Sequence, residues 1–312
     1  MKTYHRNYIY ESNDFENLCK FIIQDNAFKK EFFVWHIGRI VDWKYNLSNF
    51  KRHFPDNFNK AAHLWFDYFH NLIGFVISEE FDNEFTIFLK NQYSYLYPEL
   101  LNWVRTEWGN KYNILVTSVL QTQTEYIKFL EDAGYKKSNC LEMTRAFNTI
   151  SYKDFTIEDS TISFQSMFEN CNYEEQANLR TSAWPKPYSH EIDLQIREYT
   201  RQSPIYNAKF DFVLVNNDGR HISGCEAFID YENNTAEIER VCTHSDFYNR
   251  GYAQMILKAC MKRLYDNNIM TAFIGGSYDK TIYLYGKLGH VTEYARYSFE
   301  LHTVLVNDAS GI

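Results

Sequence analysis

Residues 236–253 constrain the fold more than any other stretch of this chain. They read Ala-Glu-Ile-Glu-Arg-Val-Cys-Thr-His-Ser-Asp-Phe-Tyr-Asn-Arg-Gly-Tyr-Ala. A strand-like run ends at Thr243, a short polar turn follows, and Arg250-Gly251-Tyr252-Ala253 opens an amphipathic helix. Free backbone N–H groups gather at a helix start, so a strand feeding such a turn is typical of phosphate binding. The stretch therefore predicts a strand–turn–helix unit with an anionic ligand.

The order of predicted elements occurs twice along the chain. Each half runs strand, turn, strand, long helix, strand, short helix, glycine, strand. Gly74 corresponds to Gly224, and Phe129–Tyr135 corresponds to Leu284–His290. Chance similarity of short α/β segments is the alternative explanation, but an internal repeat accounts for the similar spacing of these anchors. We therefore expect two domains, residues 1–150 and 151–312, joined by the polar stretch 148–162.

Hydrophobic periodicity gives the expected elements of each half. In the first half, residues 1–60 are expected to be mostly helical. The later elements of this half are strands at 72–78, 85–89, 114–119 and 141–147, and helices at 97–108 and 124–133. The second unit is expected to begin at 162–168. In it we expect strands at 210–215, 222–230, 235–243, 270–274 and 291–301, and helices at 173–182, 193–201, after Gly251 and at 280–287.

Composition excludes several classes of protein. Hydrophobic residues make up 45% of the chain, enough for a globular core throughout. No apolar run approaches the roughly 18 residues that span a bilayer, and Met1–Tyr10 lacks the apolar core of a signal peptide. The six cysteines form no CxxC pair, and several lie in apolar runs. We expect buried, reduced thiols in a cytoplasmic protein, with no disulfide frame, no metal site and no membrane partner.

Charge disfavours a nucleic-acid partner. The chain carries a net charge of −8. The first 150 residues hold 17 basic and 18 acidic residues, whereas the rest hold 15 basic and 22 acidic. An acidic second half mildly favours a cationic or amine ligand, although solvated surface acids are the commoner cause. The chain also lacks the GxxxxGK[ST] and GxGxxG motifs of nucleotide-binding loops.

Two motifs together resemble the GNAT superfamily of acyl-CoA-dependent N-acyltransferases. The turn Tyr248-Asn249-Arg250-Gly251-Tyr252-Ala253 is similar to the family's Arg/Gln-x-x-Gly-x-Gly/Ala helix start, with Tyr248 where Arg or Gln is usual. Leu284-Tyr285-Gly286-Lys287-Leu288-Gly289-His290 is similar to its Leu-Tyr-x-x-x-Gly-Phe segment, with His290 for the usual Phe. The resemblance implies an α/β (α+β) fold of two GNAT-like domains, each a mixed, mostly antiparallel central sheet flanked by helices.

The resemblance also implies the cosubstrate and the residues that hold it. Acetyl-CoA would place its diphosphate on the helix-start N–H groups, favoured by the helix dipole. Its pantetheine arm would run along the backbone of the preceding strand. The implied binding residues are Val241, Cys242, Thr243, Tyr248, Asn249, Arg250, Gly251, Tyr252, Ala253 and Gln254.

Amide formation from a thioester needs a base and an acid. A protonated amine is not a nucleophile, so a base must remove a proton. Glu239 and Glu237 share one face of the strand, and we take Glu239 as the first candidate and Glu237 as the second. Tyr285 matches the family tyrosine that protonates the leaving thiolate. The alternative for the two glutamates is that they are surface or ion-paired carboxylates without a catalytic role. The alternative for Tyr285 is that it only packs in the core.

The first half resembles a GNAT fold that has lost its cofactor turn. Leu130 stands where Tyr285 stands in the second half, and Tyr93–Pro98 replaces the glycine turn. We therefore expect one active site, with its acceptor wall in the loop Trp184–His190 and its flanking helices. The expected activity is N-acetylation of a primary amine on a small molecule or peptide, and the chain is a possible homodimer.

Two other functions stay open at this stage. One is a non-catalytic acyl-CoA-binding or interaction protein, which the departures at Tyr248 and His290 would suit. The other is an aminoacyl-tRNA-dependent transferase with the same double fold. The acidic second half argues against that reading, because tRNA needs a basic track.

Overall fold

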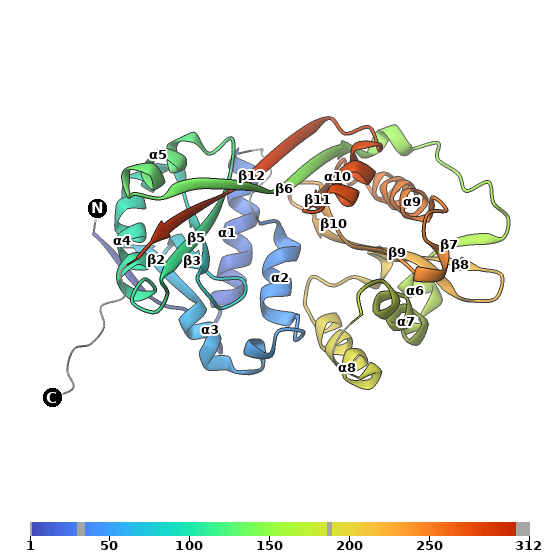
Figure 1. Ribbon diagram of the computed structural model, residues 1–312, viewed down its shortest axis with the longest axis horizontal. Helices are drawn as coiled ribbons and strands as arrows, with labels where there is room; N and C mark the ends of the chain where they lie inside the picture. Colours follow the sequence, from blue (N-terminus) through green and yellow to red (C-terminus); the bar gives the residue numbers. More distant parts are fainter. Residues whose placement is uncertain (1, 30–34, 186–188, 304–312) are drawn as a thin grey trace. The chain divides into compact units, whose positions relative to one another are not determined.

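The computed structural model describes residues 2–29, 35–185 and 189–303 of the 312. The chain divides into two compact units (Figure 1). Unit 1 comprises residues 1–34, 49–142 and 294–312, and unit 2 comprises residues 35–48 and 143–293. The expected boundary after residue 150 differs from this division, since residues 35–48 and 143–150 belong to unit 2 and residues 294–303 belong to unit 1.

Unit 1 is built on a mixed sheet. The strand order is β1-β2-β3-β4-β5-β12, and every pair is antiparallel except β4 with β5. The strands are β1 (Thr3–Asn7), β2 (Ala62–Asp67), β3 (Leu72–Ile77), β4 (Glu84–Leu89), β5 (Ile114–Leu120) and β12 (Thr292–His302). The helices are α1 (Asp14–Lys29), α3 (Pro55–Ala61), α4 (Tyr97–Glu107) and α5 (Thr124–Asp132), with 3₁₀ turns η1 (Phe50–His53) and η2 (Asn91–Leu96).

Unit 2 repeats this arrangement. The strand order is β7-β8-β9-β10-β11-β6, again antiparallel except for one pair, β10 with β11. The strands are β6 (Lys136–Asn148), β7 (Ile162–Ser166), β8 (Asp211–Asn216), β9 (His221–Asp230), β10 (Thr235–Thr243) and β11 (Thr271–Gly276). The helices are α2 (Ile37–Tyr45), α6 (Met167–Asn170), α7 (Tyr173–Ala183), α8 (His190–Arg201), α9 (Tyr252–Asp266) and α10 (Asp279–Gly286), with 3₁₀ turns η3 (Thr149–Tyr152), η4 (Ala208–Phe210) and η5 (Ser245–Phe247).

The predicted fold class is confirmed, but the last strands of the two copies are exchanged. β6 follows α5 in the sequence, yet it pairs with β11 through Met143–Asn148. β12 follows α10, yet it pairs with β5 through Arg296–His302. Each sheet is therefore completed by a strand from the other half of the sequence, which is why no single cut separates the units.

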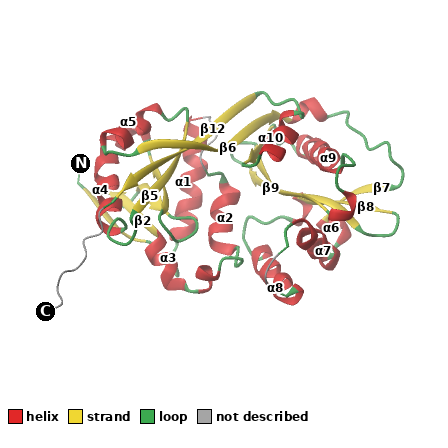
Figure 2. Ribbon diagram, viewed as in Figure 1, coloured by secondary structure: helices red, strands yellow, loops and turns green. Residues whose placement is uncertain are grey.

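The sheet of unit 2 has one apolar and one charged face. Cys225, Ala227 and Ile229 of β9 join the apolar cluster that α9 covers. Glu226 and Phe228 lie on the opposite face, where α2 and α7 pack (Figures 1 and 2). The approach of α2 is so close that a Cβ on Gly38 would lie 2.5 Å from the Phe228 ring. Charged side chains are thus enclosed between the sheet and these helices.

Three sequence-based expectations need correction. Residues 1–60 are helical only in part, because β1 pairs with β2 at the edge of the first sheet and β2 itself was missed. Of the cysteines, all six are free, but Cys140 and Cys171 are exposed. The stretch 148–162 is not a plain linker, since the buried Tyr152 donates a hydrogen bond to the carbonyl of Leu288.

Candidate active site

The turn between β10 and α9 exposes the start of a long helix. Gly251 is the N-cap of the 15-residue α9 and has φ = +84°, a conformation that glycine adopts without strain. The first backbone bond of the helix runs from Met255 N to the Gly251 carbonyl at 3.0 Å. A Cβ at Gly251 would meet no atom within 4 Å. The N–H groups of this helix start therefore face open space, an arrangement that suits an anion, and the anion site itself stays a prediction.

The strand before this turn separates from its parallel neighbour. β10 pairs with β11 only over Thr235–Glu237, whereas its pairing with β9 continues to Thr243. A bulge follows Glu239, because Arg240 and Val241 together oppose Cys225. Arg240 has φ = +53°, so the chain bends at this position. The second half of β10 therefore has one backbone edge turned away from the β11 ladder.

A groove of about 890 Å³ lies along this edge and reaches the turn. All ten residues expected to bind the cosubstrate line it, together with Tyr285. The complete lining is Ala183, Trp184, Val241, Cys242, Thr243, Phe247, Tyr248, Asn249, Arg250, Gly251, Tyr252, Ala253, Gln254, Tyr278, Lys280, Thr281, Tyr283, Leu284, Tyr285 and Lys287. Residues of both sequence motifs thus line one groove.

The groove also contains the tyrosine predicted as the acid. Tyr285 lies on α10 and is 5% exposed. Burial raises the pKa of its phenol well above the ordinary value, and the charge of Glu239 adds to the effect. The phenol therefore keeps its proton across neutral and alkaline pH, which suits a donor.

The two candidate bases occupy different positions on β10. Glu239 is the last residue before the bulge, is half-buried and pairs directly with Glu226 on β9. Glu237 is buried beside His36, with 3.9 Å between its Oε2 and His36 Nδ1, and is opposite Phe228. Burial lowers the His36 pKa to about 3, so this imidazole is neutral at physiological pH. Position alone makes Glu239 the more accessible carboxylate.

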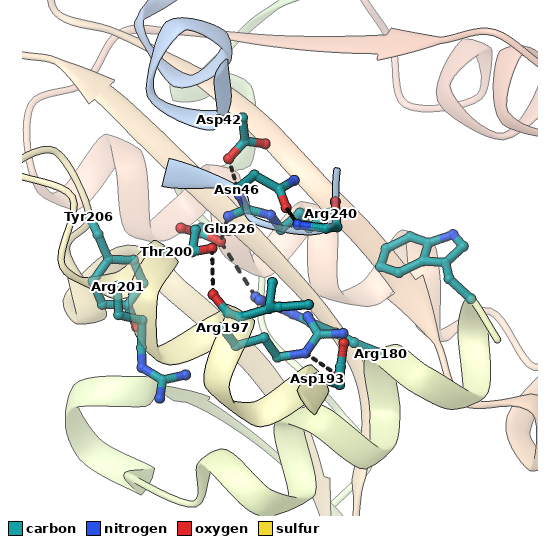
Figure 3. Close-up of a pocket in the computed structure, with 13 residues that line it drawn as sticks. Asp42, Asn46, Arg180, Asp193, Arg197, Thr200, Arg201, Tyr206, Glu226 and Arg240 are labelled. Carbon is teal, nitrogen blue, oxygen red and sulfur yellow. Dashed lines mark hydrogen bonds and ion pairs between the residues drawn. The ribbon is translucent and has the colours of Figure 1, made fainter. Parts of the chain in front are cut away.

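A second, charged cavity of about 210 Å³ opens on the α2 and α7 face of the sheet (Figure 3). Trp184 lines both this cavity and the groove, and Arg240 of the cavity is followed directly by Val241 of the groove. The lining is Asp42, Asn46, Ser48, Arg180, Trp184, Asp193, Ile196, Arg197, Thr200, Arg201, Tyr206, Glu226 and Arg240. The cavity therefore adjoins the expected thioester end of the groove.

The predicted acceptor wall accounts for part of this cavity. Trp184 and the helix α8 contribute as expected, while residues 186–188 of the predicted loop lie outside the described residues. His190 forms a surface pair with Glu174 at 2.7 Å. His244 caps η5, where its Nδ1 accepts a hydrogen bond from the Asp246 N–H at 3.2 Å. Both histidines therefore have structural contacts.

Sequence reasoning missed the residues that carry most of the cavity's charge. Asp42 comes from α2, which is near the N-terminus of the chain but belongs to unit 2. Arg180 and Glu226 are almost completely buried, at 7% and 2% exposure. The available signal was Glu226 itself, a charge inside the apolar run Ile222–Ile229. Ion pairs between distant segments leave no periodic pattern in a sequence.

The described residues contain no group of three or more His, Cys, Asp or Glu side chains placed to hold a metal ion. No helix in the same residues combines the length and apolar character needed to cross a bilayer.

Comparisons with known proteins agree with the fold. Residues 173–290 match the model of the Acetyltransferase (GNAT) family. A tandem GNAT protein from the clavulanic acid biosynthesis pathway superposes with a TM-score of 0.64 at 7% identity, covering 96% of this chain and 98% of that one. A GCN5-related N-acetyltransferase from Sphaerobacter thermophilus gives 0.60 at 12% identity, with 97% and 98% covered.

A third solved structure has a similar fold, whereas the curated proteins give no match. A GNAT-family acetyltransferase from Colwellia psychrerythraea has a TM-score of 0.59 at 14% identity, covering 96% of this chain and all of that one. No curated protein matches the sequence. At these identities the structural likeness establishes the fold. Residues 173–290 therefore form a GNAT acetyltransferase domain, and the chain has the fold of a tandem GNAT protein.

Proposed function

We propose that this protein is an acetyl-CoA-dependent N-acetyltransferase with one active site, in unit 2. The observation that carries the proposal is the groove in which the open helix start, the separated strand β10 and Tyr285 meet. The acceptor is a primary amine of a small molecule or peptide, and no nucleic acid takes part. We place the reaction in the cytoplasm. Whether the chain forms a homodimer is a separate question for solution measurements.

The cosubstrate fits this groove by charge and shape. The diphosphate would lie on the N–H groups of Tyr252, Ala253 and Gln254, with the side chain of Arg250 beside it. Pantetheine would follow the open edge of β10 past Val241 and Thr243. The acetyl group would then end near the Arg240 bulge, between Tyr285 and Glu239.

The reaction needs two proton movements. Glu239 takes a proton from the substrate ammonium, so that the neutral amine can attack the thioester carbonyl carbon. The C–N bond forms, the C–S bond breaks, and the thiolate takes the phenol proton of Tyr285. The second proton of the nitrogen returns to Tyr285 as the amide forms. The products are the N-acetyl amine and free coenzyme A, and Glu237 is the second candidate for the base.

The two departures from the family motif support a competing function, a non-catalytic acyl-CoA-binding protein. Tyr248 is 49% exposed and lines the groove where Arg or Gln is usual. His290, in place of Phe, lies 3.2 Å from Glu293 through its Nε2. Neither change removes an N–H group from the helix start. We therefore favour the enzyme, since Tyr285 and Glu239 are both retained.

The direct test combines binding and turnover. Acetyl-CoA at millimolar concentration is expected to raise the melting temperature, and an amine panel is expected to release free thiol from it. The Tyr285→Phe variant should bind acetyl-CoA normally but turn over slowly, whereas Tyr231→Phe, at an exposed turn of the same unit, should behave as wild type. Absence of stabilisation contradicts the binding site, and binding without turnover on any amine favours the non-catalytic function.

A further inference from the structure

The charged cavity of unit 2 contains an ion-pair network centred on Glu226. Asp211, Glu226 and Glu239 form a row across β8, β9 and β10. Arg240, turned by the bulge, donates hydrogen bonds to both Glu226 and Asp42, so it connects β9 with α2 (Figure 3). The network therefore ties the cavity floor on the sheet to its helical walls.

A second arginine occupies the same network from α7. Arg180 Nη2 donates to Asp211 Oδ1 at 3.0 Å and lies 3.5 Å from Glu226 Oε2. Asp211 also accepts hydrogen bonds from Gln176 at 2.8 Å and Tyr206 at 3.1 Å. Asp211 is thus fully engaged within the protein, and its charge is not available to a ligand.

Glu226 has one oxygen with no partner. Its Oε2 accepts from Arg240 and Arg180, but its Oε1 is buried and accepts no hydrogen bond from the described residues. A buried carboxylate oxygen without a donor destabilises the folded protein. Because Glu226 lines the cavity, a ligand with a cationic N–H donor would satisfy it.

The arginines, in contrast, have unused donors. Among the residues that the structure describes, Arg197 donates only through Nε, to Asp193 at 2.6 Å, and Arg180 donates only through Nη2. Arg201 contacts the ring of Tyr173 at 4.0 Å and has no carboxylate partner among the described residues. Guanidinium groups with free N–H pairs bind carboxylates in a two-pronged geometry. The cavity thus offers a site for an anion beside a site for a cation.

We propose that the acceptor is a small free amino acid, held by both of its charges. Its ammonium group donates to Glu226 Oε1, and its carboxylate accepts from Arg180 and Arg197. This inference rests on the proposed acetyl transfer and names its substrate class. Glu226 positions the amine, and Glu239, its direct neighbour on β10, remains the base.

The other amines left open by the sequence fit this cavity less well. A polyamine carries only positive charge and would face four lining arginines, Arg180, Arg197, Arg201 and Arg240. An aminoglycoside is too large, because drug-sized ligands occupy roughly 300–1,000 Å³ and the cavity has about 210 Å³. Ile196 and Tyr206 supply apolar surface for a small side chain.

The first experiment compares matched substrates on the unaltered protein. Acetyl transfer is measured by thiol release for a panel of small amino acids, their carboxamides and a diamine. Loss of the carboxylate removes charge-assisted hydrogen bonds, so kcat/KM should fall about 10- to 100-fold from each amino acid to its carboxamide. Equal kcat/KM for the two members of each pair, or a preference for the diamine, overturns the proposal.

The second experiment locates the effect at the cavity. Arg197→Gln should raise KM about 10-fold for amino acids and leave KM for their carboxamides unchanged. Arg263→Gln is the matched control, because within the described part of the chain Arg263 also has a single carboxylate partner, Glu169 at 3.7 Å, but it does not line the cavity. Arg197 is the preferred variant, since its charge is less buried than that of Glu226. An equal rise in KM for both substrate types contradicts the assignment.

Direct binding separates this inference from the proposed function. Calorimetry of amino acids and carboxamides with the protein and coenzyme A needs no turnover, and tighter binding of the amino acids is the expected result. If acetyl-CoA stabilises the protein and amines are acetylated without any carboxylate preference, the substrate class is wrong and the proposed function stands. If acetyl-CoA fails to bind, the proposed function is wrong, whatever the amino acids do.

Discussion

The two copies of the fold differ most where a parallel strand pair leads into a long helix. In unit 2, β10 ends at Thr243 and Gly251 opens α9 beside the groove. In unit 1, β4 ends at Leu89, and the 3₁₀ turn η2 leads into α4 through Leu96 and Tyr97. Both parallel pairs are short, at three and two paired residues. The frame is thus the same, and the turn decides whether a helix start is accessible.

Aromatic side chains fill the equivalent region of unit 1. Tyr93, Leu96 and Tyr97 are buried in its apolar core, and Tyr97 stacks on Tyr126 with 4.6 Å between ring centroids. Leu130, which corresponds to Tyr285, is fully buried. A strand separation therefore becomes a ligand groove only when small or polar residues leave it open. Unit 1 thus has a packed apolar core at the place where unit 2 has the groove that we propose for the cosubstrate.

The largest effect is expected at Tyr285 of unit 2. It is compared with Tyr126, a buried tyrosine on the corresponding helix of unit 1. Tyr285→Phe is expected to lower kcat about 100-fold, the usual worth of a general acid, with little change in KM. Tyr126→Phe on α5 should leave kcat unchanged, although burial raises both pKa values well above normal. Steady-state kinetics at saturating acetyl-CoA checks this. Full activity of Tyr285→Phe would remove its role as acid.

The next effect concerns the glycine turn. Gly251→Ala is expected to weaken acetyl-CoA binding about 10-fold, because the new methyl group points into the space proposed for the diphosphate. Gly219→Ala is the matched control, since Gly219 has φ = +80° and equally open surroundings in a hairpin turn. Both variants should lose about 1 kcal/mol of stability from backbone strain. Equal affinities in calorimetry would place the diphosphate elsewhere.

A smaller effect is expected at the contact between α2 and β9. Gly38→Ala forces a Cβ against Phe228, so the free energy of unfolding of unit 2 should fall by about 1–3 kcal/mol. Because α2 carries Asp42, KM for the acceptor should rise as well. Lys44→Ala on the same helix should change stability by less than about 0.5 kcal/mol. Denaturant unfolding and kinetics measure both effects, and an unchanged KM would separate α2 from the acceptor site.

The last effect is a pH dependence of stability that is shared by the two units. Burial lowers the pKa of His36 in unit 2 and of His63 in unit 1 to about 3. The unfolded chain takes up these protons below about pH 6.5 and the folded chain does not, so stability is lost as pH falls from 6.5 toward 3. His36→Gln should flatten the loss by up to about 1.4 kcal/mol per pH unit. Unfolding curves at pH 6.5 and 5 with an unchanged difference would contradict this.

Local patterns predicted most of the elements but not their partners. The turn at Gly251 and the segment around Tyr285 were recognisable because each motif is contiguous in sequence. The exchange of β6 and β12 was not, because a strand that completes either sheet has the same alternation. The short strand Thr3–Asn7 has too few apolar residues to signal its pairing with β2.

For the candidate site too, the contiguous motifs could be predicted from the sequence, whereas contacts between distant segments could not. Every residue of the expected cofactor set lines one groove, because those residues lie on one strand, turn and helix. The charged cavity, which we propose as the acceptor site, depends on Asp42, Arg180 and Glu226, which come from three distant segments. In the sequence the indication of this cavity is Glu226, a charged residue within an apolar run. The charges that balance Glu226 could not be assigned before the fold was known.

The central claim is that a chain with two copies of the fold has one cofactor site, and the number of acetyl-CoA molecules bound per chain tests it most directly. Isothermal titration calorimetry on the intact protein should give one site per chain, weakened in Gly251→Ala. Two sites of similar affinity would show that unit 1 also binds the cosubstrate. No detectable binding at millimolar concentration would contradict the account of unit 2 itself.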